Sequence, residues 1–219
     1  MKLYSYYRSS ASYRVRIALN LKNIAHEQVA VHLVKDGGQQ LMPGYRELNA
    51  DGLVPTLVDD DLDGVSHSLA QSLAIIEYLD ETHPQAPLLP GGAADRAYVR
   101  SLALSIACDI HPINNLRVLK YLTNTLKIDE AGKDAWYRHW VEQGLRAFET
   151  TLSRSGKTGL FCFGDTPTMA DCCLVPQMYN ARRFQCDLSG MPTIARIDAH
   201  CLTQQAFIDA APEQQPDAV

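Results

Sequence analysis

The sequence has no long hydrophobic run, no run of basic residues and no pair of cysteines at metal-binding spacing. Its longest apolar stretches, such as Leu102 to Ala107, are too short to cross a bilayer, and no signal-peptide pattern follows Met1. A net charge of −5 without a basic cluster argues against a nucleic-acid-binding protein. We therefore expect a cytoplasmic protein that binds neither membranes nor nucleic acids.

The spacing of the six cysteines does not suit a metal site or a set of disulfide bonds. They show no CxxC spacing, and two of them, Cys172 and Cys173, are adjacent. This arrangement suits neither a zinc site nor an ordinary disulfide framework. We expect six reduced thiols and no bound metal.

What is present is enough to form a real core. The chain has 219 residues, of which 46% are hydrophobic and 21% charged, as in an ordinary globular protein. Its N-terminal part alternates the patterns of strands and helices, which indicates a small α/β unit. We expect strands at 2–6, 26–33, 53–58 and 65–67, helices at 13–22, within 39–49 and at 72–83, and a hairpin loop at 59–64.

The segment 84–94 is rich in proline and glycine and is typical of an interdomain linker. Beyond it only helical periodicity is found, which predicts an all-helical second part. Thr168 and Asp171 have the spacing of a capping box at a helix start. We expect helices at 95–126, 133–152, 168–181 and 193–211, the last with a break at 201–204.

Serine hydroxyls gather where the first helix begins, at Ser9, Ser10 and Ser12. Backbone N–H groups and the positive end of the helix dipole meet there, so this turn can stabilise an anion. The simpler interpretation is that these serines are ordinary N-cap residues, and this motif taken alone favours that interpretation.

A second unusual feature is Val54-Pro55, a proline inside a strand pattern. A cis peptide bond there would turn the backbone of Val54 toward a ligand. Gln71-Ser72 stands at another helix start, where it could hold an amino-acid head group. The alternative is an edge strand with an ordinary serine cap, which the serine-rich turn makes less plausible.

Over nearly its whole length the sequence resembles the glutathione transferases, and in particular their zeta class, which includes maleylacetoacetate and maleylpyruvate isomerases. The residues that carry the resemblance are 9–19, 164–171, 174–177 and 183–184, besides Val54-Pro55 and Gln71-Ser72. The resemblance implies a thioredoxin-like, glutathione-binding α/β domain at 1–83, the linker at 84–94, and an all-α helical bundle at 95–219 that completes the substrate site.

The resemblance also implies roles for individual residues. Ser9 and Ser10 are expected at the reacting thiolate of glutathione, which serves as a cofactor, and three arginines are expected to bind a dicarboxylate substrate. The glutathione-binding residues implied are Ser9, Ser10, Gln40, Val54, Gln71, Ser72, His111 and Asn115, and the substrate-binding arginines are Arg8, Arg117 and Arg183.

The sequence departs from the zeta pattern at Ala11, where the class often has a cysteine. No protein thiol is available at that position. If the family's chemistry is retained, the reacting sulfur must therefore come from glutathione.

The activity implied is the cis–trans isomerisation of maleylacetoacetate to fumarylacetoacetate, as in the breakdown of aromatic amino acids. Three alternatives stay open: a maleylpyruvate isomerase, a transferase or dehalogenase acting on α-halo acids, and a non-catalytic binding protein. The retained Ser9, Gln71 and Ser72 argue against the last of these. A homodimer is expected from the resemblance alone.

Overall fold

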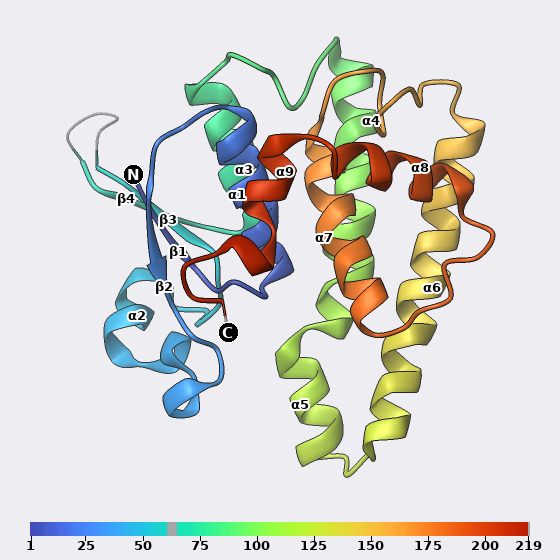
Figure 1. Ribbon diagram of the computed structural model, residues 1–219. Coiled ribbons are helices and arrows are strands. Elements are labelled where there is room, and N and C mark those ends of the chain that lie inside the picture. The colour runs from blue at the N-terminus through green and yellow to red at the C-terminus, as the bar shows by residue number, and fades with distance from the viewer. Residues whose placement is uncertain (61–64, 219) are drawn as a thin grey trace. The chain divides into compact units, whose positions relative to one another are not determined.

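The computed structural model describes residues 1–60 and 65–218, and it divides into two compact units. The first unit contains Met1–Leu88 together with the residues from Thr203 onward, and the second is Leu89–Leu202. Most of the hairpin loop expected at 59–64 lies outside the described residues. Figure 1 shows the strands in the first unit and the long helices α4, α6 and α7 in the second.

The first unit is built on a four-stranded sheet in the order β2-β1-β3-β4. β1 runs parallel to β2 and antiparallel to β3, which is antiparallel to β4. Tyr4 pairs with Thr56, and Thr56 pairs with Ala70. The last residues of β1 and β4 and the first residue of β3 therefore share one end of the sheet, called here the Thr56 end. The strands are β1 Lys2–Ser5, β2 Glu27–Ala30, β3 Thr56–Asp59 and β4 His67–Ala70.

Helices α1 (Ser10–Leu21) and α3 (Ser72–Thr82) pack together on one side of the sheet, and α9 (Gln205–Ala210) packs against α1 (Figure 1). Every residue from Ser12 to Leu19 is buried. A helix enclosed in this way needs apolar residues on all its faces, which explains the adjacent aliphatic side chains in this segment. The short helix α2 (Pro43–Leu48) and the 3-10 turns Lys35–Gly37 and Gln39–Leu41 lie between β2 and β3.

The C-terminal residues from Thr203 onward form part of the first unit, whereas the sequence assigned them to the helical domain at 95–219. The physical reason is a set of hydrogen bonds that α1 side chains donate to backbone carbonyls of this segment. The Tyr13 hydroxyl donates to Phe207 O at 3.3 Å, and Asn20 Nδ2 donates to Ala206 O at 3.0 Å. Helical periodicity identifies the helix but carries no signal for which unit it joins.

The second unit is helical, as predicted, but the single helix expected at 95–126 is wrong. The chain there forms α4 (Ala93–Leu104), a π-helical turn (Ser105–Ile110), a 3-10 turn (Pro112–Asn114) and α5 (Leu116–Asn124). Pro112 has no N–H to continue the helix, which explains the interruption. The remaining helices are α6 Glu130–Arg154, α7 Met169–Arg183 and α8 Pro192–Cys201.

The break expected at 201–204 is confirmed, because α8 ends at Cys201 and α9 begins at Gln205. The capping box at the start of α7 is also confirmed. The buried carboxylate of Asp171 accepts from the backbone N–H of Thr168 at 2.8 Å and from its hydroxyl at 2.7 Å. Within the described residues, no helix is both long enough and apolar enough to span a membrane.

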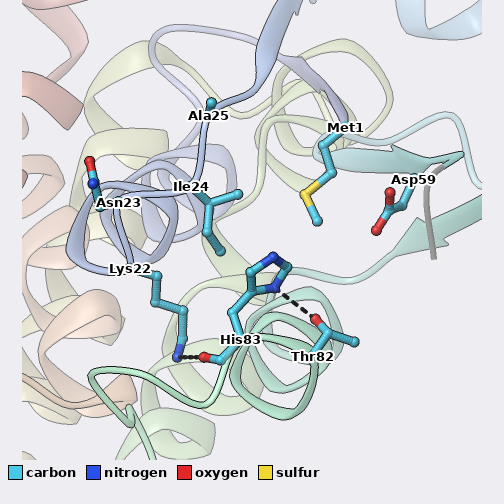
Figure 2. Close-up of a pocket in the computed structure, with 8 residues that line it drawn as sticks. All are labelled: Met1, Lys22, Asn23, Ile24, Ala25, Asp59, Thr82 and His83. Carbon is cyan, nitrogen blue, oxygen red and sulfur yellow. Dashed lines mark hydrogen bonds between the residues drawn. The ribbon is translucent and has the colours of Figure 1, made fainter.

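A cavity of about 450 Å³ opens at the end of the sheet opposite Thr56 (Figure 2). It contains none of the residues expected to bind glutathione. Beside it the Lys22 ammonium bonds to Asp80 Oδ1 at 2.7 Å and donates to the carbonyl of His83 at 2.8 Å. The residues that line the cavity are Met1, Lys22, Asn23, Ile24, Ala25, Asp59, Thr82 and His83.

The Lys22–Asp80 pair should be important for stability. Its two side chains are 0% and 7% exposed, so Lys22→Met would leave a buried carboxylate without its counter-charge. We expect the free energy of unfolding to fall by about 3–5 kcal/mol in urea denaturation. Lys2→Met is the control, because Lys2 and Glu27 are 3.9 Å apart and largely exposed, and it should cost under about 1 kcal/mol. Equal losses in the two variants would contradict this assignment.

Candidate active site

Ser9 lies where β1 leads into α1, at the Thr56 end of the sheet. Its N–H donates to Tyr6 O at 2.9 Å, and its Oγ accepts the N–H of Ser12 at 3.2 Å as the N-cap of α1. Because the oxygen acts as acceptor in this bond, the hydroxyl proton can be donated to an acceptor outside the helix. Ser9 is partly exposed, whereas Ser10, the first residue of α1, is buried. Ser9 is therefore the better placed hydroxyl of the two.

The Val54-Pro55 peptide bond is cis, as predicted, and it directly precedes β3. Two side chains hold both ends of this dipeptide. The Tyr45 hydroxyl donates to Leu53 O at 2.6 Å, and Asn49 Nδ2 donates to the same carbonyl at 2.9 Å and to Thr56 Oγ1 at 3.1 Å. Sequence reasoning missed Tyr45 and Asn49, because nothing in their spacing relates them to the proline.

Gln71-Ser72 begins α3, also at the Thr56 end. Gln71 has a backbone φ of 72°. This left-handed conformation costs a residue with a Cβ roughly 1–2 kcal/mol, and residues in such conformations are concentrated at ligand-binding and active sites. Ser72 is buried, and its Oγ accepts a hydrogen bond from Arg14 Nη1 at 3.2 Å. Arg14 thus connects the starts of α1 and α3, a role that sequence reasoning did not foresee.

Gln40 lies in the 3-10 turn before α2, where Gly38 and Gly52 approach it closely. A Cβ atom at Gly38 would lie 2.7 Å from Gln40 Nε2, and one at Gly52 would lie 3.1 Å from Gln40 O. The turn therefore packs against the segment that leads to Val54. Gln40 Oε1 is buried, and among the described residues it has no hydrogen-bond partner. A buried orphan acceptor of this kind is suited to receive a donor from a ligand.

Three arginines lie at the Thr56 end, although the whole chain has a net charge of −5. Arg8 is exposed, with its guanidinium carbon 4.9 Å from the centre of the Tyr7 ring. Arg14 and Arg16 are both 2% exposed. Burial lowers the pKa of Arg16 to about 10, so this guanidinium remains charged at neutral pH. An anion at this end would meet fixed positive charge.

Four expected site residues lie in the second unit. His111 and Asn115 flank the Pro112–Asn114 turn, and Asn115 Oδ1 caps α5 by accepting the N–H of Arg117 at 3.2 Å. Arg117 is exposed in the first turn of α5. Arg183, the last residue of α7, is also exposed, and its guanidinium carbon lies 4.9 Å from the Phe184 ring centre.

The six cysteines all belong to the second unit, and residues 1–88 and 203–219 contain none. Cys162 and Cys172 are buried, and burial raises the pKa of both thiols. Buried thiols with raised pKa values are poor nucleophiles. The Ser9 turn therefore has no protein thiol within its own unit.

Comparison with known proteins agrees with this arrangement. The family model for the glutathione S-transferase N-terminal domain matches residues 3–87, and that for the C-terminal domain matches 134–185. A "Probable maleylacetoacetate isomerase" of Vibrio cholerae is 50% identical, over 99% of this chain and 97% of that protein. A "Maleylpyruvate isomerase" of a Ralstonia species is 49% identical over the full length of both chains.

Solved structures show the same likeness. A holo structure of maleylpyruvate isomerase, described as a bacterial zeta-class glutathione S-transferase, has a TM-score of 0.94 and 48% identity over both full chains. The maleylacetoacetate isomerase of Methylobacterium extorquens AM1, solved with bound malonate and glutathione, has a TM-score of 0.93 and 40% identity, again over both full chains.

The chain belongs to the glutathione S-transferase family. Within that family it is a member of the zeta class. The expected fold, a thioredoxin-like α/β domain followed by a helical bundle, is confirmed.

Tyr45 should be needed to hold the Val54-Pro55 segment. Tyr45→Phe would remove a donor from Leu53 O, so we expect a loss of about 1–2 kcal/mol in the free energy of unfolding. If this segment binds glutathione, the variant should also bind it more weakly in calorimetry. Tyr121→Phe is the control, because Tyr121 is 56% exposed in the second unit. Unchanged glutathione affinity in Tyr45→Phe would show that the segment does not depend on this bond.

Proposed function

We propose that this protein is a glutathione-dependent isomerase that converts maleylacetoacetate to fumarylacetoacetate. The observation that carries the proposal is the Thr56 end of the sheet. Two hydroxyl-bearing helix starts and a cis-proline segment meet there, in a unit without any cysteine. The similar proteins named as isomerases, at up to 50% identity, support the same activity.

The residues at this end fit glutathione, a tripeptide with two carboxylates, an ammonium group and a thiol. Gln71 and the N–H groups at the start of α3 suit the γ-glutamyl head group. The backbone of Val54 suits a peptide bond, and the orphan Oε1 of Gln40 can accept from a ligand N–H. Ser9 and Ser10 would then face the thiol. His111 and Asn115 are proposed as further contacts from the second unit.

Bound glutathione supplies a thiolate that adds reversibly to the conjugated double bond, so that the bond can rotate before the thiolate leaves. The task of the protein is to favour that thiolate. A thiol of pKa ~8.5 is mostly protonated at neutral pH, and lowering the pKa by about two units requires ~2.7 kcal/mol. A helix dipole contributes roughly 0.3–1 kcal/mol and a hydrogen bond to a charged group about 1.5–3 kcal/mol. The Ser9 hydroxyl should therefore lower the pKa of the glutathione thiol by more than the dipole at the start of α1 does.

The dicarboxylate substrate needs fixed positive charge, which bidentate guanidinium groups supply well. Arg8, Arg117 and Arg183 are proposed for this role. All three are exposed, so their guanidinium groups are accessible from solvent. Ring contacts with Tyr7 and Phe184 restrict Arg8 and Arg183 and lower the entropy lost on binding. The proposed enzyme is a cytoplasmic homodimer.

The direct test follows the ultraviolet band of maleylacetoacetate with and without glutathione. We expect rapid loss of the band only when protein and glutathione are both present. Absence of glutathione-dependent loss at several substrate concentrations would refute the isomerase proposal.

Ser9 is the residue whose change should alter the pH profile. Ser9→Ala removes the hydrogen bond to the thiolate, so the pKa of bound glutathione should rise toward ~8.5 and the rate at pH 7 should fall roughly 10-fold or more. Activity should recover as the pH is raised, because the thiolate then forms without assistance. The pH dependence of kcat measures this shift.

Ser9→Asp is the matched variant for that experiment. Aspartate can still cap α1 through its side-chain oxygen, but at pH 7 it has no proton to donate and it adds negative charge. It should therefore be at least as impaired as Ser9→Ala while α1 keeps its stability. Near wild-type activity in Ser9→Asp would mean that another group stabilises the thiolate.

Maleylpyruvate is the second candidate substrate. The specific observation is that the Ralstonia maleylpyruvate isomerase is 49% identical, almost as similar as the Vibrio protein at 50%. The two substrates share the cis-enone dicarboxylate, so the same residues could act on both. The ratio of kcat/KM for maleylacetoacetate to that for maleylpyruvate decides between them, and we expect it to exceed one.

A further inference from the structure

The turn that carries Ser9 is held by charged side chains that lie far from it in the sequence. The N–H of Tyr7 donates to Asp217 Oδ2 at 3.0 Å, across 210 residues of sequence. The carbonyl of the same residue accepts from Arg16 Nη2 at 3.0 Å. Both backbone polar groups of Tyr7, two residues before Ser9, therefore bond to charged side chains. Hydrogen bonds of this kind are stronger than those between neutral groups.

Arg16 joins this turn to the C-terminal residues. Its Nε donates to Ala210 O at 2.9 Å, and its Nη1 donates to Ser5 Oγ at 3.1 Å, at the end of β1. The guanidinium is almost completely buried, so it must be compensated by acceptors and by negative charge. Burial lowers the pKa of Arg16, and the nearby Tyr13 and Asp217 oppose that lowering electrostatically.

The end of the chain also packs beside the second part of the site. Ala218 contacts a buried cluster that contains Tyr6, Tyr7 and Val54. The C-terminal residues therefore bond to the turn that carries Ser9 and pack against the cluster to which Val54 also belongs. A shift of these residues would disturb both.

We propose that Asp217 is a positioning residue that fixes the Tyr6–Ser9 turn and so sets the direction of the Ser9 hydroxyl. This inference rests on the proposed function, because Ser9 is assigned there to the glutathione thiolate. Asp217 itself touches neither the thiol nor the substrate in this account. It acts through the backbone of Tyr7, and Arg16 shares that task.

The second carboxylate oxygen of Asp217 allows a graded test. Asp217 Oδ1 is buried and has no hydrogen-bond partner among the described residues. Asp217→Asn can keep an acceptor for the Tyr7 N–H, but it removes the negative charge and replaces one carboxylate oxygen with an amide NH₂ group. Asp217→Ala removes acceptor and charge together. Impairment should therefore increase from wild type to Asp217→Asn to Asp217→Ala.

Asp209→Asn is the matched control. Asp209 lies in α9, is exposed, and accepts from Gln205 Nε2 at 2.7 Å within the same helix. The substitution makes the same change of charge in the same segment, but it leaves the Tyr6–Ser9 turn untouched. Its exchange rates and activity should match those of the wild type.

The primary measurement is the hydrogen-exchange rate of the Tyr7 amide by NMR in the full chain, which needs neither substrate nor turnover. We expect exchange to be at least about 10-fold faster in Asp217→Ala than in Asp209→Asn. The second measurement is the ultraviolet titration of the thiol of bound glutathione, whose pKa should rise in the same order. KM for the dicarboxylate should stay unchanged while kcat at pH 7 falls.

The outcomes separate this inference from the proposed function. If the wild type binds glutathione but does not isomerise the substrate, the proposed function fails, while amide exchange and thiol titration still decide the role of Asp217. Equal exchange rates and equal thiol pKa values in Asp217→Asn and Asp209→Asn would overturn the inference. If Asp217→Ala does not fold, the comparison of the two asparagine variants decides.

Discussion

Two buried guanidinium groups on α1 hold together the parts of the site that lie in the first unit. Arg14 donates to Ser72 at the start of α3, and Arg16 donates to the end of β1, to the Tyr6–Ser9 turn and to α9. Burying a cation is costly unless acceptors are near it, so Arg16 fixes the backbone carbonyls of Tyr7 and Ala210, and Arg14 fixes the Ser72 hydroxyl. The positions of Ser9 and Ser72 follow from this constraint. The same two guanidinium groups place positive charge at the Thr56 end, partly offset at Arg16 by Asp217, in a chain of net negative charge.

Much of the fold could be predicted from short-range patterns. Alternation of apolar residues located the strands, and hydroxyls at helix starts located Ser9 and Ser72, because both signals lie within a few neighbouring residues. The proline after Val54 could be interpreted as cis because it interrupts a strand pattern and the serine-rich turn made the alternative, an edge strand, less plausible. The resemblance to a known class then related these separate motifs to one ligand.

The parts that could not be predicted depend on long-range contacts. Arginines such as Arg14 and Arg16 are ordinarily expected on the protein surface. Only the apolar residues around them, Val15 and 17–19, indicate that the whole helix is buried. The return of the C-terminal residues to the first unit depends on single hydrogen bonds, such as that between Tyr7 and Asp217, which leave no periodic signal. The π-helical turn before His111 was missed for a related reason, since apolar periodicity continues through it.

The protein provides the environment and glutathione provides the sulfur, which is regenerated in every cycle. The first unit, which contains the Ser9 turn, has no cysteine that could act as the nucleophile in place of glutathione. The most direct test supplies glutathione at far less than one equivalent of maleylacetoacetate and follows both compounds by proton NMR. The account predicts complete conversion to the trans isomer with all glutathione recovered unchanged. Conversion that stops at one equivalent of glutathione, with a conjugate as product, would contradict it.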